Sequence, residues 1–279
     1  TNRRAAMKFD PSDRSSNIEV RRGGMGTVGG LGIGGLIIAI IGAFLGVDPS
    51  ALINATQTAG PSSETVSTEP LNNEQAFLAN VLGTTEKVWG KVFQQQGATY
   101  RKPKLVVYEG ATRTACGTGQ TAMGPFYCPE DEQLYIDLTF MRELQTRFRA
   151  PGDFAQGYVV AHEVGHHVQK LTGAFRQLEA AKATGNRTQF NRTSVAIELQ
   201  ADCYAGVWAH HAGTMGKLDA GDIEEGLAAA AAVGDDRLQK QATGRVSPDS
   251  FTHGSSAQRT QWFTRGYQTG NPTSCETSR

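Results

Sequence analysis

Two histidines and a glutamate in the stretch HEVGH, residues 162–166, have the types and spacing of a zinc site with a catalytic carboxylate. Positions four apart stack on one face of an α-helix, so His162 and His166 can reach one metal ion. Glu163 lies beside them, where it can act on a water molecule held by that metal. The pattern therefore predicts metal-assisted hydrolysis.

The residues around this motif, 154–171, are compatible with a buried helix that stops at Thr172 and Gly173. A motif this short also occurs by chance, in which case the histidines are solvated or satisfied by ordinary hydrogen bonds. Against that alternative, three polar side chains in an apolar helix are costly unless each has a partner, and a metal ion supplies one. The apolar neighbours are Tyr158, Val159, Val160, Ala161, Val164 and Val168.

A catalytic zinc ion usually has three protein ligands and an open position for water, so one further donor is expected. Glu198 is the best candidate, because residues 194–209 read as a second buried helix whose small residues permit close approach to the first. The alternative is an ordinary helix-surface carboxylate, which the apolar flanks Val195, Ile197 and Leu199 disfavour. The other downstream candidates are Asp202, His210, His211 and His253.

Three polar residues near these ligands have expected supporting roles. Asp202 lies one turn after Glu198 on the same helix face, so we expect it to hydrogen-bond the outer nitrogen of a zinc-binding histidine. His167 points about 100° away from His166 on a helix, which favours packing or hydrogen bonding over metal binding. His253, in a loop rich in glycine and serine, is a candidate second electrophile near the oxyanion; an ordinary surface histidine is the alternative.

These motifs resemble those of the neutral zinc metallopeptidase family of bacterial membrane-anchored proteins, within the gluzincin pattern of HExxH followed by ExxxD. The resemblance rests on HEVGHHVQ and, further along, ELQADCYAGVW, and it covers the chain from about residue 70 onward. It implies zinc on His162, His166 and Glu198, a general-base role for Glu163 and a supporting role for Asp202. The resemblance also runs through GPFYCP at 124–129, YIDL at 135–138, GDFAQ at 152–156, HGSSAQR at 253–259, Trp262 and Phe263.

The elements that must position these residues indicate an α+β fold, a zincin-like and mainly helical domain with a small sheet. An extended substrate is expected to pair with the edge of that sheet, along the strand at 133–138. Apolar periodicity predicts this strand and another at 104–108, and helices at 74–95, 139–148, 219–233 and 256–267 besides the two metal helices.

Residues 26–47, which precede the domain, are predicted to form one transmembrane helix. They are uncharged, long enough to cross a ~30 Å hydrocarbon core, and rich in glycine, which membrane helices tolerate. A cleaved signal peptide, a glycine-rich loop and a soluble core helix are the alternatives. Basic residues in the segment 1–25 predict a cytoplasmic tail, which places the catalytic domain outside the cytoplasm on the bacterial inner membrane.

Two further divisions follow from composition. Residues 48–72, rich in serine, threonine, alanine and proline, are predicted to be a flexible linker, and residues 73–279 the metallopeptidase domain. The small-xxx-small repeats of the anchor would allow a homo-oligomer through one helix face, although composition alone also produces such repeats. These repeats comprise Gly26, Gly30, Gly34, Gly42 and Gly46.

Charge and cysteine content narrow the class of protein. The 27 basic and 27 acidic residues create no global field that would attract nucleic acid, so no nucleic-acid partner is expected. The 4 cysteines fit an exported domain, where an oxidising compartment would permit Cys116–Cys128 and Cys203–Cys275 disulfides. Other pairings and buried free thiols remain alternatives. The absence of CxxC spacing disfavours a cysteine-rich zinc site.

Together these features predict a zinc-dependent endopeptidase with Zn²⁺ as cofactor and a peptide or protein as substrate. Zinc would activate water, and Glu163 would act as the general base. The alternative is a non-catalytic, membrane-tethered binding or scaffold domain that keeps zinc for structure. Glu163 argues against this alternative, because a purely structural site has no need of that carboxylate.

Overall fold

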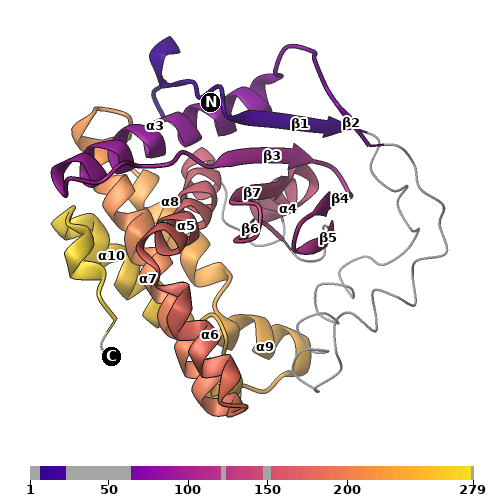
Figure 1. Cartoon of the computed structure of the whole chain (residues 1–279), viewed down its shortest axis with the longest axis vertical. Coiled ribbons are helices and arrows are strands. Elements are labelled where there is room, and N and C mark those ends of the chain that lie inside the picture. Colours follow the sequence, from indigo (N-terminus) through magenta and orange to yellow (C-terminus); the bar gives the residue numbers. More distant parts are fainter. Residues whose placement is uncertain (1–6, 23–63, 121–123, 147–151, 278–279) are drawn as a thin grey trace.

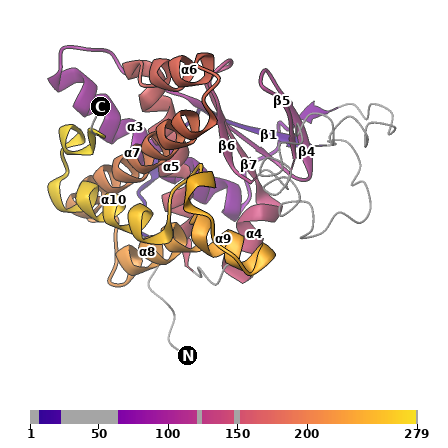
Figure 2. The same cartoon turned by 90° about the horizontal axis from the view of Figure 1, so that it is seen from below.

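Figure 1 shows the computed structural model of the chain, which describes residues 7–22, 64–120, 124–146 and 152–277. Most of the helices pack together on one side of the molecule, and a sheet lies on the other side. Viewed from below, the same two parts are seen side by side (Figure 2). The mixed helix-and-sheet class expected from the sequence is therefore observed.

The main sheet has 5 strands in the order β2-β1-β3-β7-β6. The three central strands β1, β3 and β7 are parallel to one another. The two edge strands, β2 and β6, are antiparallel to their neighbours. In β3 and β7 the last 4 residues are all buried, as expected for parallel strands covered on both faces. The strands are β1 Ile18–Arg22, β2 Thr65–Val66, β3 Lys104–Tyr108, β6 Phe126–Cys128 and β7 Gln133–Asp137, with a separate hairpin of β4 Ala111–Thr114 and β5 Gly117–Gln120.

The expected substrate strand at 133–138 is not the edge of the sheet. It corresponds to β7, which pairs with β3 on one side and with β6 on the other. Phe126 and Cys128 of β6 lie opposite Tyr135 and Gln133 of β7. The edge strand on this side is therefore β6, which periodicity did not reveal because it has only 3 residues.

All the helices predicted after residue 73 are present, with ends shifted by a few residues. The second metal helix, α7, is longer than predicted and begins at Arg187. Two polar helices, α6 and α9, were not predicted. The helices are α3 Asn73–Gln95, α4 Leu138–Thr146, α5 Asp153–Thr172, α6 Phe175–Ala183, α7 Arg187–Thr214, α8 Asp222–Ala232, α9 Asp235–Thr243 and α10 Ser256–Thr269, with short 3-10 helices at Pro11–Asp13, Pro248–Ser250 and Pro272–Cys275.

Glycines allow α7 to pack closely against its two long neighbours, α5 and α10. A Cβ at Gly165 of α5 would lie 3.0 Å from the carbonyl oxygen of Ala201 on α7. A Cβ at Gly206 of α7 would lie only 2.0 Å from the carbonyl oxygen of Phe263 on α10. Any larger residue at these positions would push the helices apart, so the glycines set the distance across which the site residues on α5 and α7 meet.

Both disulfides expected from the sequence are present, Cys116–Cys128 and Cys203–Cys275. The first ties the turn between β4 and β5 to the edge strand β6. The second ties the middle of α7 to the 3-10 helix near the C-terminus. The alternative of buried free thiols is thereby excluded for all 4 cysteines.

The N-terminal residues 7–22 belong to the same fold as the rest of the domain, contrary to the predicted cytoplasmic tail at 1–25. Strand β1 pairs with β3 over Ile18↔Leu105 to Val20↔Val107, and with β2 at Arg21↔Val66. Residues 18–22 are therefore part of the main sheet.

The structure does not support the predicted transmembrane helix at 26–47 or the single-pass inner-membrane localisation based on it. Across the described part of the chain, no helix combines the length and the apolar character that a membrane crossing requires. Residues 26–47, with the glycine repeats proposed for self-association, and residues 48–63 of the predicted linker lie outside the described residues.

A buried ion pair attaches the N-terminal segment to the helices. The Asp13 carboxylate, 1% exposed, accepts a hydrogen bond from Lys87 Nζ on α3 at 2.7 Å and pairs with Lys217 Nζ after α7 at 2.7 Å. Burial disfavours the charged carboxylate, but hydrogen bonds from Lys217 and Lys87 outweigh it and hold the pKa of Asp13 below 3.8. The ionised form therefore stabilises the fold.

Replacing Asp13 with asparagine is expected to lower the free energy of unfolding by about 1.5–3 kcal/mol at neutral pH, because charge-assisted hydrogen bonds are lost. The pKa is lower in the folded state, so this contribution is fully present above pH 3.8 and disappears as the pH falls further. Urea denaturation at several pH values measures it, with exposed Asp249→Asn as control. Equal stability of the two variants would show that residues 7–22 do not anchor the fold.

Candidate metal centre

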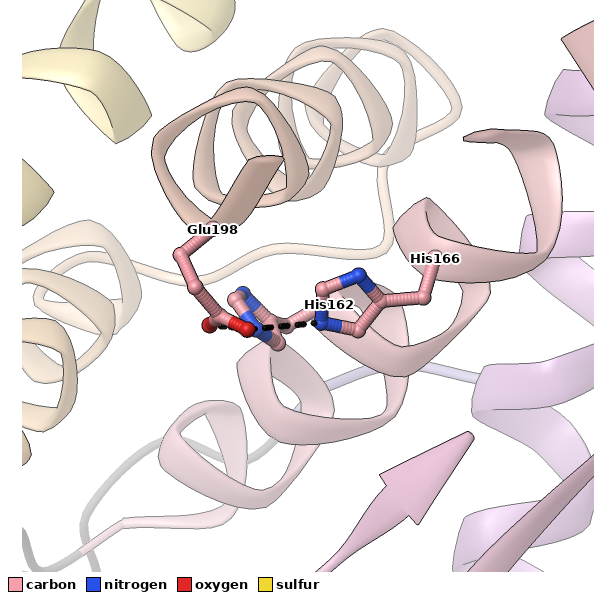
Figure 3. A group of neighbouring side chains, drawn as sticks. All are labelled: His162, His166 and Glu198. Carbon is pink, nitrogen blue, oxygen red and sulfur yellow. Dashed lines mark ion pairs between the residues drawn. The ribbon is translucent and has the colours of Figure 1, made fainter. Parts of the chain in front are cut away.

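Three side chains from α5 and α7 converge on one point, as Figure 3 shows. His162 Nε2 lies 3.3 Å from Glu198 Oε2, and His166 Nε2 lies 3.5 Å from Glu198 Oε1. One donor atom from each of the three residues lies within 4.8 Å of the others. The structure thus brings together the three residues predicted as zinc ligands.

The donor set fits a zinc ion. Donor atoms about 2.0–2.2 Å from a tetrahedral zinc lie roughly 3.3–3.6 Å apart, which matches both measured separations from Glu198. Two imidazole nitrogens and one carboxylate oxygen are also a ligand combination of catalytic zinc sites, which keep a fourth position open for water. His162, His166 and Glu198 would therefore hold zinc without rearrangement of the helices.

Asp202 contacts the His162 ring on the side opposite to Nε2, the atom that faces Glu198. Its Oδ1 lies 2.9 Å from His162 Nδ1, and its side chain is fully buried. Burial raises the pKa of Asp202, but the charges of Arg259 and His162 outweigh burial and lower it, so the carboxylate is ionised and can only accept. Nδ1 of His162 must then carry a hydrogen, so Nε2, which faces Glu198, is the nitrogen that can exchange its proton for a metal ion.

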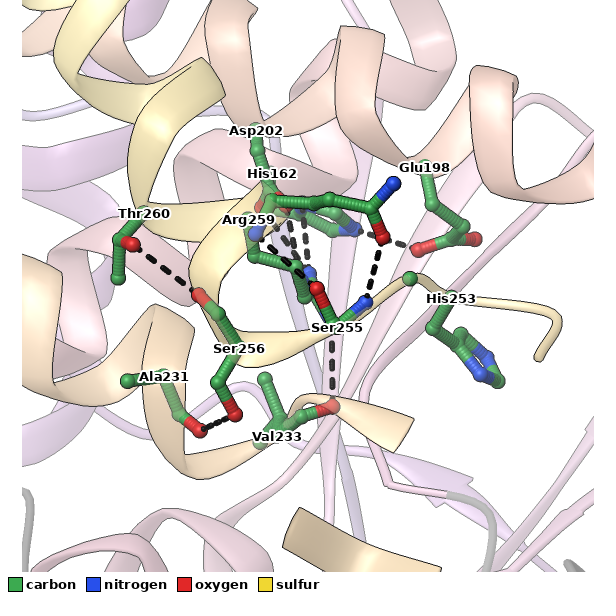
Figure 4. Close-up of polar contacts among 12 residues, drawn as sticks. His162, Glu198, Asp202, Ala231, Val233, His253, Ser255, Ser256, Arg259 and Thr260 are labelled. Carbon is green, nitrogen blue, oxygen red and sulfur yellow. Dashed lines mark hydrogen bonds and ion pairs between the residues drawn. The ribbon is translucent and has the colours of Figure 1, made fainter. Parts of the chain in front are cut away.

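A buried arginine completes this part of the site (Figure 4). Arg259, on α10 and 4% exposed, donates from Nε to Asp202 Oδ2 at 2.8 Å and from Nη2 to Asp202 Oδ1 at 3.0 Å. The Tyr158 hydroxyl donates to Asp202 Oδ1 at 2.5 Å and accepts from Arg259 Nη2 at 3.1 Å. Arg259 lies in the HGSSAQR stretch of the family resemblance, and no role was predicted for it.

Glu163 lies on α5 directly after His162 and is 7% exposed. Burial raises the pKa of its carboxyl group, although the positive charges of His166 and His162 act in the opposite direction. Its place in the sequence puts it on the turn of α5 that carries His162. This is the neighbourhood in which the sequence motif requires a proton acceptor.

His253 is not among the three converging donors. Its side chain is 48% exposed, and its Nδ1 lies 3.2 Å from Asp235 Oδ1 and 3.0 Å from Thr252 Oγ1. Figure 4 shows it on the loop before α10, on the side of the site where Glu198 lies. Burial lowers the pKa of His253, but Asp235 and Glu198 outweigh burial and raise it. The predicted electrophilic role stays a prediction.

The remaining histidines have hydrogen-bond partners other than the three zinc-donor residues His162, His166 and Glu198. His167 is fully buried; its Nδ1 lies 3.1 Å from the Tyr127 hydroxyl and its Nε2 2.6 Å from the Arg101 carbonyl oxygen. His210 Nδ1 and His211 Nε2 face backbone carbonyl oxygens at 2.7 and 2.9 Å. His210 and His211, which were candidates for the third zinc ligand, therefore stabilise the contact between α7 and the end of α10.

A second group of neighbouring donors contains only carboxylates, from Asp153, Asp222 and Glu225. These residues lie in the first turns of α5 and α8, where negative charge interacts favourably with the helix dipole. Asp153 accepts a hydrogen bond from the Met7 backbone N–H at 2.8 Å. Among the donor groups of the described residues, only the first contains the nitrogen ligands typical of zinc.

Comparison with known proteins identifies the family of this chain. A family model described as "Putative neutral zinc metallopeptidase" matches residues 3–278. The protein "Uncharacterized protein YpfJ" of Escherichia coli (strain K12) is 48% identical over 283 residues, which cover 97% of this chain and 98% of that protein. "Uncharacterized protein Rv2575" of Mycobacterium tuberculosis (strain ATCC 25618 / H37Rv) is 48% identical over 191 residues, 64% of this chain and 63% of that protein. No solved structure matches the chain significantly.

Proposed function

The chain belongs to the family described as "Putative neutral zinc metallopeptidase", and we propose that it is a zinc-dependent endopeptidase. The observation that carries the proposal is the convergence of His162, His166 and Glu198 at separations that suit one zinc ion, with Glu163 next to His162 in the sequence of α5. A binding or scaffold domain with structural zinc would need the three ligands but not Glu163.

Three side chains would hold the ion, through Nε2 of each histidine and the Glu198 carboxylate. A bound zinc ion supplies Lewis acidity, which lowers the pKa of water and polarises a peptide carbonyl group. Asp202 keeps the His162 hydrogen on Nδ1, so that Nε2 presents its lone pair. Arg259 balances the charge of Asp202 in a region closed to solvent.

Glu163 moves the proton in the proposed reaction. Its carboxylate accepts a proton from the attacking water, whose oxygen bonds to the carbonyl carbon of the peptide. The carbon–nitrogen bond then breaks, and the leaving amine takes the proton that Glu163 accepted. Because Glu163 is buried, little bulk water competes for that proton.

An extended peptide would pair with the edge strand β6, by hydrogen bonds between backbones. This strand is tied to the metal helix, because the Tyr127 hydroxyl of β6 lies 3.1 Å from His167 Nδ1 on α5. The rings of His166 and Tyr127 also both lie against the Phe175 ring, at centroid distances of 6.2 and 6.5 Å, so a peptide on β6 would be held close to the ligands. Half-exposed His253 remains the proposed second electrophile for the oxyanion.

The proposal is tested with the full chain and a library of fluorogenic peptides. Cleavage is expected for the zinc-loaded protein, with loss after dialysis against a chelator and recovery when one equivalent of zinc is returned. Mass spectrometry of the products should show internal peptide bonds hydrolysed. Stoichiometric zinc without cleavage of any peptide would favour the scaffold alternative, and cleavage that survives zinc removal would contradict the proposed mechanism.

Arg259→Met is expected to lower the free energy of unfolding of the zinc-free protein by about 3–5 kcal/mol, because it leaves Asp202 buried without its cationic partner. The matched control is Arg265→Met on the same helix, where the side chain is exposed and lies over the Trp262 ring. The control should change stability by less than about 1 kcal/mol. Chemical denaturation in the presence of chelator gives both values, and equal effects would contradict the buried pairing.

A further inference from the structure

The second zinc-binding histidine has an outer partner of its own, Gln169, which lies one turn further along α5. Gln169 is fully buried, and its side chain takes part in three hydrogen bonds. Its Oε1 lies 2.8 Å from His166 Nδ1, and its Nε2 donates to the Ile197 carbonyl oxygen at 2.7 Å and to Gln200 Oε1 at 3.0 Å. The side chain therefore connects the metal helix to α7.

These bonds fix which end of the Gln169 amide faces the histidine. The Ile197 carbonyl oxygen is only an acceptor, so the Gln169 NH₂ group must point to it. The Gln169 Oε1 must then face His166, and this oxygen is also only an acceptor. Nδ1 of His166 must consequently carry a hydrogen, so Nε2, the atom that faces Glu198, is the nitrogen available to a metal ion.

A second glutamine supports this orientation from α7. Gln200 Nε2 donates to the Cys275 carbonyl oxygen at 3.2 Å, so Gln200 Oε1 is turned toward the Gln169 NH₂ group. Cys275 is itself joined to α7 by the disulfide to Cys203. The series of hydrogen bonds from His166 thus ends at a covalently fixed point in the backbone.

We propose that Gln169 is the positioning residue of His166 and sets the tautomer in which His166 binds zinc. The inference rests on the proposed zinc site but not on peptidase activity. It gives the two histidines different outer partners, a carboxylate for His162 and a neutral amide for His166. A neutral acceptor adds no further charge to a site that already contains Glu163, Glu198 and Asp202.

Gln169→Met, which keeps the size but removes the strong acceptor, is expected to weaken zinc binding by about 10–100-fold. Competition with a chromophoric zinc chelator measures the affinity. The matched control is Gln75→Met, another buried glutamine, which caps α3 far along the chain. It should leave zinc affinity within about 2-fold of the wild type. A similar affinity for Gln169→Met and the wild type would overturn the proposal.

The His166 tautomer is the readout that a merely structural role would not change. Nitrogen NMR of the zinc-free wild type, recorded at a pH at which the His166 ring is neutral, should show the single hydrogen of that ring on Nδ1. Gln169→Met should lose this preference, while Gln75→Met keeps it. Protonation of wild-type His166 on Nε2 would overturn the proposal, even if Gln169→Met failed to fold. Neither measurement uses a substrate, so absence of peptide cleavage would count against the proposed function alone.

Discussion

Glu163→Gln is expected to reduce peptide cleavage by about 100–10,000-fold, the usual contribution of general acid–base catalysis. The amide has almost the same size and shape as the carboxylate, but it cannot accept a proton from water at neutral pH. Zinc binding should persist, because the ligand atoms belong to His162, His166 and Glu198. The measurement is kcat for one library peptide, together with metal analysis of the same sample.

The matched control is Glu179→Gln, the same change on the exposed surface of α6. It removes one negative charge without touching the site and should leave kcat unchanged. Cleavage by Glu163→Gln at a rate near that of the wild type would remove Glu163 from the mechanism. Loss of zinc in this variant would instead show that Glu163 helps to hold the metal.

The metal helices could be predicted from the sequence because their signals are local. The apolar neighbours of His162 give α5 its buried faces, and Gly173 ends it in the left-handed conformation expected of a helix stop. Glu198 was identifiable because a catalytic zinc needs a third ligand and the residues around Glu198 are apolar. The close approach of α5 and α7 through Gly165 then makes the predicted ligands meet.

The N-terminal strand was mistaken for a cytoplasmic tail because its charged residues are satisfied by distant partners. Arg22 donates to Glu69 Oε2 at 2.7 Å, and Glu19 Oε2 accepts from Lys104 Nζ on β3 at 3.1 Å. In the sequence these charges look like the basic flank of a membrane helix. Only the pairing of β1 with β3 and β2 shows that they belong to a sheet.

The polar helices and the outer partners of the histidines were missed for a related physical reason. In α6 only Ala181 is buried, so no apolar stripe marks the helix. Arg259 and Gln169 look like surface residues by type, and their burial depends on partners contributed by other elements. A single sequence contains no local signal for such contacts. The free-energy cost of burying a polar group is offset by hydrogen bonds, and these form only in the folded chain.

Glu198→Gln is expected to weaken zinc binding more strongly than Asp202→Asn, because the two carboxylates lie on opposite sides of His162. Glu198 faces the Nε2 atoms of both histidines, at 3.3 and 3.5 Å, so its replacement removes the only anionic donor among the three ligands. Asp202 faces Nδ1 of His162, where asparagine can still accept the hydrogen bond through its own Oδ1.

The expected loss for Asp202→Asn is about 10–100-fold in zinc affinity, typical of an outer partner of a ligand, and Glu198→Gln should exceed it. Chelator competition gives both affinities, with circular dichroism to confirm that each variant is folded, because Asp202→Asn also leaves Arg259 without its anion. If zinc affinity fell further in folded Asp202→Asn than in Glu198→Gln, Asp202 would have to bind the metal directly. The hydrogen bond seen between Asp202 and His162 would then have to break when zinc binds.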